Sequence, residues 1–280
     1  MTTNSRNSRV IRQAKATFAL SLATLLGALA ITQAGSASAS MKAPKPTPLA
    51  VGQGAAAPGG GSFLNAPIPA NVLNIPLVDS SGKTFTLASL KGQTVIISDF
   101  LTSCQEICPM TTINMREIGD AVAASKLKSK VKVLEVTVDG ARDTPARLTS
   151  YQALFQDKNW TLVTGTDTNL KKFWTFFGAN LTKSPYTAAQ MKKLPLDWQT
   201  GKPSTYDVSH TDMVVIVDAK GSWSWLDLGN PKATKGVIPP KLKKYLNEEG
   251  LNNLAKPQEP SWDSKAVLSA LSSITGTMIG

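Results

Sequence analysis

The stretch Gln93–Pro109, QTVIISDFLTSCQEICP, determines the expected fold. Its first nine residues are mostly β-branched or apolar, a run typical of a central strand that is buried on both faces. Cys104 and Cys108 follow this strand, and Pro109 is a residue favoured in the first turn of a helix. The stretch therefore predicts a buried strand, a short loop with two cysteines, and a helix that starts near Pro109.

Strand and helix patterns alternate on both sides of this stretch. Their order predicts an α/β fold, a mixed sheet flanked by helices, as expected of a thioredoxin-like fold. A C-terminal extension, 230–280, has two helical patterns whose place in the fold the sequence leaves open. The other predicted elements are strands at 74–78, 84–90, 131–138 and 160–163, a helix that starts at 143–145, a helix at 168–177, and a hairpin of 212–218 with 222–228.

Cys104 and Cys108 are the only cysteines of the 280-residue chain. They lie beside a predicted helix N-terminus, where unpaired N–H groups and the helix dipole favour a thiolate. A separation of one helical turn or a tight loop brings both sulfurs to one side, within reach of one metal ion or of each other. A structural disulfide is the alternative, although so short a loop constrains the unfolded chain little.

His210 is the only histidine, in the segment YDVSHTDMVVIVD. A histidine in a loop is most often a hydrogen-bonded structural residue. In a thioredoxin-like sheet, however, the strand that follows His210 begins beside the first strand–helix loop, where the cysteines lie. Two thiolates and one imidazole form a soft, three-coordinate set for Cu(I), and an added oxygen ligand accommodates Cu(II). Structural zinc normally has four Cys and His ligands, so this inventory favours copper over zinc.

Four segments carry a family resemblance, and they occur in the expected order. Together they resemble the Sco/SenC family of copper chaperones. The resemblance implies a thioredoxin-like domain over 71–229 that binds copper through Cys104, Cys108 and His210. The segments are FLTSCQEICP at 100–109, VTVDGARDTPARLTSYQALF at 136–155, WTLVTGTDTNLKKFWTFFG at 160–178 and YDVSHTDMVVIVDAKG at 206–221.

The resemblance also implies a role. Members deliver copper to the binuclear copper site of cytochrome c oxidase subunit II, or reduce the cysteines of that site. The chain departs from the usual family pattern at three positions: Gln105 replaces a proline, Gly140 replaces a proline, and Ser209 replaces an aspartate-like residue.

Two classes of function remain open for the cysteine pair. In a metallochaperone the pair holds copper and releases it by ligand exchange, without turnover. In a thiol–disulfide oxidoreductase the same pair reduces target cysteines. Such enzymes usually have two residues between the cysteines and a proline facing them, whereas this chain has three residues between them and Ser209-His210 at the facing position. The pattern favours the chaperone.

Asp139 ends the second predicted central strand, beside the cysteine loop. One hypothesis is that its carboxylate orients His210 or supplies an oxygen to Cu(II). The alternative is a turn carboxylate for the following loop. Within that loop, Asp143 or Thr144 is expected to cap the next helix, and Arg142 to be a solvated charge.

Residues 1–39 have the pattern of a signal peptide or a membrane anchor. Four cations precede an apolar stretch that ends in small residues, with Ala37-Ser38-Ala39 as a candidate cleavage site. Residues 40–70, rich in Pro, Gly and Ala, predict a disordered linker or tether. The protein is therefore expected to be exported, to the periplasm or the outer face of the cytoplasmic membrane.

The charge pattern argues against nucleic acid as a partner. Of the net charge of +11, four positive charges lie in the first 39 residues, and the rest are spread along the chain without a basic cluster. The expected partner is a cuproprotein such as cytochrome c oxidase subunit II.

Overall fold

The structure, a computed structural model, describes residues 56–57, 60–156, 158–232, 236–256, 258–259 and 261–279. The predicted signal peptide or anchor, 1–39, and the first part of the predicted linker lie outside the described residues. Among the described helices, none combines the length and the apolar character needed to cross a membrane.

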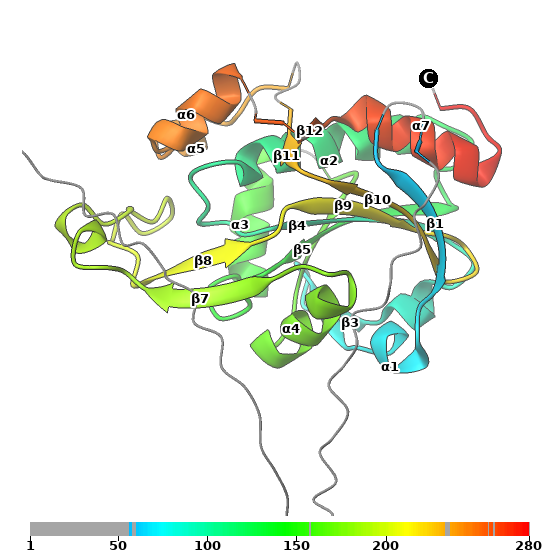
Figure 1. Ribbon diagram of the computed structural model, residues 1–280, viewed down its shortest axis with the longest axis horizontal. Helices are drawn as coiled ribbons and strands as arrows, with labels where there is room; N and C mark the ends of the chain where they lie inside the picture. Colours follow the sequence, from blue (N-terminus) through cyan, green and yellow to red (C-terminus); the bar gives the residue numbers. More distant parts are fainter. Residues whose placement is uncertain are drawn as a thin grey trace, which may run out of the picture. The chain divides into compact units, whose positions relative to one another are not determined.

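Eight strands of the described chain form one mixed sheet (Figure 1). Its central strand, β4 (Thr94–Phe100), runs parallel to β5 (Val131–Thr137) and antiparallel to β9 (Met213–Val217). The strand order is β1-β10-β9-β4-β5-β6-β2-β3. The outer strands are β1 (Ser62–Pro67), β2 (Leu77–Asp79), β3 (Thr84–Phe85), β6 (Thr161–Thr164) and β10 (Ser222–Leu228).

Helices cover both faces of this sheet. Figure 1 shows α2 and α7 along one face, with α1 and α4 on the opposite side. The chain order β4-α2-β5, followed later by the β9–β10 hairpin, is the thioredoxin-like arrangement predicted from the sequence. The helices are α1 (Ala70–Leu73), α2 (Cys108–Ala123), α3 (Pro145–Phe155), α4 (Asp167–Phe176), α5 (Pro240–Lys243), α6 (Glu248–Ala255) and α7 (Ser264–Thr275), with 3-10 turns at Leu87–Leu90 and Gln190–Lys192.

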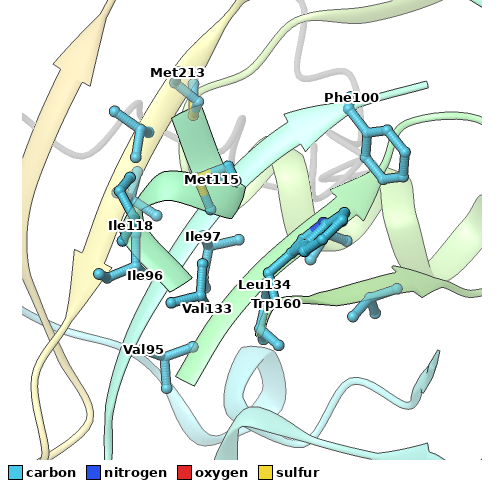
Figure 2. Close-up of a cluster of buried hydrophobic side chains, with 14 of the residues drawn as sticks. Val95, Ile96, Ile97, Phe100, Met115, Ile118, Val133, Leu134, Trp160 and Met213 are labelled. Carbon is cyan, nitrogen blue, oxygen red and sulfur yellow. The ribbon is translucent and has the colours of Figure 1, made fainter. Parts of the chain in front are cut away.

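The core lies between the sheet and α2. All seven residues of β4 are buried, as expected for its β-branched run. Ile118 of α2 and Trp160 are also buried and lie in the same cluster, shown in Figure 2. This packing fixes the carboxyl end of β4, and with it the cysteine loop, relative to the start of α2.

Two predicted boundaries are wrong. The linker was expected to extend to residue 70, but β1 pairs with β10, so the folded domain starts before residue 71. The domain was expected to end at 229, with the packing of the extension left open, and in the structure α7 packs on α2 and buries Val267 and Leu271. The C-terminal extension is therefore part of the same core, because its apolar stripe covers α2.

A separate two-stranded hairpin lies beside the main sheet. It pairs β7 (Leu181–Pro185) with β8 (Tyr206–His210), and the segment 186–205 connects them. Leu181 lies opposite His210 in this hairpin. A second small pair joins β11 (Asn230–Pro231) to β12 (Ser261–Trp262).

Candidate metal centre

The cysteine loop connects the end of β4 to the start of α2. Cys108 is the first residue of α2 and is buried, whereas Cys104 is partly exposed, and both are free thiols. The amide nitrogens of Glu106 and Cys108 lie 3.5 Å and 3.4 Å from Cys104 Sγ and donate hydrogen bonds to it. The Cys108 amide is one of the N–H groups left unpaired at a helix N-terminus, and the Glu106 amide lies in the loop just before it; both stabilise a thiolate.

The two thiols differ in acidity. A hydrogen bond from the Cys108 side chain, helped by the backbone N–H groups, outweighs burial and lowers the pKa of Cys104 to about 7. Burial raises the pKa of Cys108 well above its usual value, and the hydrogen bond to Cys104 adds to this rise. Cys104 is therefore the readily formed thiolate, and Cys108 keeps its proton until a metal displaces it.

His210 ends β8, directly before β9. Its Nδ1 lies 2.7 Å from Asp99 Oδ2, and Asp99 Oδ1 accepts a hydrogen bond from the Met213 amide at 3.0 Å. Because β9 pairs with β4, the Asp99 carboxylate on β4 reaches both groups. Asp99 therefore holds the proton on Nδ1, so that Nε2 is the ring nitrogen on which a metal could bind, as is found behind many histidine ligands.

The charge of His210 follows from this pairing. Burial disfavours the imidazolium, but the Asp99 carboxylate outweighs it, with a smaller contribution from Asp212. Together they raise the pKa of His210 to about 10. A metal that binds Nε2 at neutral pH therefore displaces a proton.

A cavity of about 230 Å³ brings the predicted residues together. Cys104, His210 and Asp212 all line it. Cys108 lies directly behind Cys104, with its amide on the Cys104 sulfur. The structure thus brings Cys104 and His210 to one cavity and places Cys108 next to Cys104. Two soft sulfurs and one imidazole nitrogen at this cavity suit copper.

Asp139 has a different role from the one hypothesised. Its carboxylate accepts hydrogen bonds from Arg142, from Lys183 Nζ at 2.7 Å and from Tyr206 Oη at 2.7 Å. Burial opposes its charge, but Lys183 and then Arg142 outweigh it and lower the pKa of Asp139. Because Lys183 lies on β7 and Tyr206 on β8, Asp139 anchors the hairpin that carries His210. The hypothesis that it orients His210 directly is wrong, since Asp99 does so.

The neighbouring loop also differs from expectation. Thr144 caps α3, as one of the two alternatives foresaw. Asp143 is instead fully buried and accepts hydrogen bonds from Thr102 and Thr137. Arg142 is not a solvated charge, because its guanidinium stacks over the Tyr206 ring and pairs with Asp139.

Two segments hold the loop between the cysteines from outside. The Gln105 side chain donates to Leu196 O at 2.8 Å, in the 186–205 connection. On the other side, the Asn247 amide donates to Gln105 O at 3.0 Å, and the Asn247 side chain donates to Glu106 Oε1 at 2.9 Å. The cavity therefore has one wall from the β7–β8 connection and one from the segment that starts α6.

The sequence reasoning missed Asp99 and Asp212. Asp99 was hidden inside the β-branched run that predicted a buried strand. A carboxylate in such a run is buried and therefore needs a charged or hydrogen-bonding partner, and this requirement could have indicated that Asp99 pairs with a polar residue elsewhere in the chain. Asp212 stands two residues after His210, where it resembles a turn residue at the start of a strand.

Comparison with known proteins now gives the family. The family model described as SCO1/SenC matches residues 74–247, more than half of the chain. The chain belongs to the SCO1/SenC family. This SCO1/SenC protein is 28% identical over 162 residues to a putative copper-binding protein of Stutzerimonas stutzeri, covering 55% of this chain and 71% of the relative.

Two further relatives show the range of similarity. The SCO1 protein homolog of Bacillus subtilis is 30% identical over 109 residues, which is 38% of this SCO1/SenC chain and 55% of the relative. The chain thus matches about half the length of that protein. The structure of Bradyrhizobium japonicum ScoI with copper bound is 27% identical, with a TM-score of 0.45 over 61% of this chain and 97% of that chain.

Proposed function

We propose that this protein is a copper metallochaperone that holds the ion through the sulfurs of Cys104 and Cys108 and through Nε2 of His210. The observation that carries the proposal is the Asp99–His210 contact of 2.7 Å on Nδ1, at a cavity that His210 shares with Cys104. A carboxylate that holds the other ring nitrogen is common behind histidine ligands of metals, and this arrangement supports the proposed role of His210. The names of two SCO1/SenC relatives, a putative copper-binding protein and ScoI with copper bound, support the choice of metal.

The unequal thiols suit capture and release of copper. Cys104, with a pKa of about 7, offers a thiolate at the cavity, while Cys108 lies behind it. Copper first meets Cys104, and Cys108 and His210 each give up a proton as they complete the site. Release occurs by ligand exchange, in which thiolates of the recipient replace those of the chaperone and no electrons are transferred.

The proposal extends to the place and the partner. The recipient is an exported cuproprotein, with the binuclear copper site of cytochrome c oxidase subunit II as the first candidate. The leader-like residues 1–39 support a location in the periplasm or at the outer face of the cytoplasmic membrane.

Copper stoichiometry of the reduced full chain tests the proposal. We expect one Cu(I) per chain in competition with a chromophoric Cu(I) chelator. Cys104→Ser and Cys108→Ser each remove a soft ligand and abolish tight binding, and His210→Ala lowers the affinity by roughly 10–100-fold. Ser209→Ala is the matched control, because Ser209 is exposed beside His210 on β8 and should bind copper like the wild type.

The same samples distinguish the thiol–disulfide alternative. A wild-type chain that binds no copper but rapidly reduces a model disulfide would favour an oxidoreductase. Unchanged copper affinity in His210→Ala would remove His210 from the site.

A further inference from the structure

Asp212 lies at the cavity of the candidate metal centre, beside His210. It lines the cavity together with Cys104 and His210. Its Oδ1 lies 3.5 Å from His210 Nδ1, and the candidate ligand atoms of Asp99, His210 and Asp212 all lie within 4.8 Å of one another. The ion pair with His210 is its charged contact, and within the described part of the chain no hydrogen bond holds the carboxylate elsewhere. It is therefore a carboxylate of the cavity lining that remains available to a metal in the cavity.

The two buried carboxylates near the site are already engaged. Asp99 accepts from His210 and from the Met213 amide. Asp139 is held by three donors in the loop and the β7–β8 hairpin, away from the cavity lining. Neither can turn to a metal without leaving a buried partner unpaired, which costs free energy.

The two other carboxylates of the cavity lining have partners too. Glu106 accepts from the Asn247 side chain, and Asp207 accepts from the backbone amide of Val208. Asp207 is also exposed on β8. Among the described carboxylates around the cavity, Asp212 is thus the one best placed to supply an oxygen ligand.

The two oxidation states of copper prefer different sets of ligands, and this difference suggests a role for the Asp212 carboxylate. Cu(I) is satisfied by two thiolates and an imidazole, whereas Cu(II) prefers four ligands in a tetragonal arrangement that includes nitrogen or oxygen. An anionic oxygen also offsets the extra positive charge of Cu(II). The three proposed ligands alone therefore leave Cu(II) one ligand short.

We propose that the Asp212 carboxylate is the fourth ligand of Cu(II) in this site and takes little part in binding Cu(I). The inference rests on the proposed copper function, and it assigns the oxygen ligand that the three predicted residues lack. It makes Asp212 the residue that sets the relative affinity of the site for the two oxidation states.

The test uses the full chain with its cysteines reduced, and Cu(II) in a weak glycine complex as the probe. In Asp212→Asn, a side chain of the same shape without the charge, we expect the Cu(II) affinity to fall by roughly 10-fold or more. The copper hyperfine splitting in the electron paramagnetic resonance spectrum should change as well. Cu(I) affinity, measured with a chromophoric chelator, should stay within about 3-fold of wild type, since only the fourth ligand is removed.

Asp207→Asn is the matched control, because it makes the same substitution in the same cavity lining and should leave both affinities and the spectrum unchanged. Glu106→Gln tests the rival carboxylate. The inference is overturned if Asp212→Asn keeps the wild-type spectrum and Cu(II) affinity, or if Glu106→Gln causes the change instead. Failure of the wild type to bind Cu(I) would instead defeat the proposed function, and Cu(I) binding without Cu(II) binding would defeat only the role of Asp212.

Discussion

The carboxylate of Asp99 organises the site at the scale of single residues. One oxygen faces His210 Nδ1 at 2.7 Å and the other accepts from the amide of Met213. The imidazolium is therefore both oriented and held in its charged form by a group that belongs to the central strand. Copper affinity is expected to rise with pH, because the Nε2 proton has to leave before the metal binds.

Asp99→Asn tests this pairing. We expect the pKa of His210 to fall from about 10 by roughly 1–3 units, because the opposite charge beside it is lost. Proton NMR of the metal-free chain is the measurement, and its reading is simple because His210 is the only histidine. A titration near 10 in both proteins would show that Asp99 does not hold the imidazolium charge.

The same shift has a consequence for stability. An unfolded histidine releases its proton near pH 6.5, but folded His210 keeps it until about 10. The Asp99–His210 pair therefore contributes fully below pH 6.5, and its contribution to the free energy of unfolding is lost as the pH rises through 10. Between these limits, stability attributable to the pair should decrease with pH in the wild type and much less in Asp99→Asn, as measured by urea unfolding.

Sequence reasoning identified the candidate ligands more readily than the residues that support them. Cys104 and Cys108 were visible because two cysteines so close together at a strand–helix junction are chemically distinctive. His210 was visible as the only imidazole, and its place before β9 brought it to the same edge. Asp99 and Asp139 were not assigned correctly, because their roles depend on which neighbouring strand or hairpin supplies the partner, and local sequence does not contain that pairing.

At the scale of elements, α6 presses directly on the cysteine loop. Gly250 is buried, and a Cβ atom at this position would lie 2.1 Å from the carbonyl oxygen of Gln105. The contact explains why a glycine occupies this helix despite its low helix propensity. Together with the Asn247 hydrogen bonds, it sets how close one wall of the cavity comes to Cys104.

Gly250→Ala should therefore push α6 and the loop apart. We expect a destabilisation of about 1–3 kcal/mol, as for other overpacked sites, and faster alkylation of Cys104 because its cover is displaced. Chemical unfolding and the rate of thiol labelling measure the two effects. Asn252→Ala, on the exposed side of the same helix, is the control and should alter neither. Wild-type labelling in Gly250→Ala would show that α6 does not limit access to the sulfur.

Elements with strong periodicity were predicted well, and weakly patterned ones were not. The run that became β4 and the Thr144-Pro145 start of α3 carry local signals, so their places were foreseen within a few residues. The strands β7 and β8 were missed because the residues around them are mostly polar and exposed. They are defined by pairing with each other and by the anchor at Asp139, which are contacts between distant parts of the chain.

At the scale of the whole molecule, the C-terminal helix completes the fold. Leu271 of α7 is fully buried, whereas Met278, seven residues later, is 88% exposed. Leu271→Ala should lower the free energy of unfolding by about 2–5 kcal/mol, because it leaves a cavity against α2. Met278→Ala should leave stability unchanged. Urea unfolding of both variants is the test, and equal stability would mean that α7 is an appendage.

The position of α7 in the chain also affects the order of events during synthesis. The ribosome releases β4, both cysteines and β5 well before β9, and it releases α7 after β9. Until β9 has been made, one edge of β4 has no partner strand. The cysteine loop also lacks its neighbour His210 and its contact with the α6 segment. An incompletely synthesised chain thus exposes two thiols that can be oxidised. It also exposes an unpaired strand edge that can aggregate with other chains. Copper capture by the complete ligand set therefore has to wait until β8, with His210, and β9 have been made.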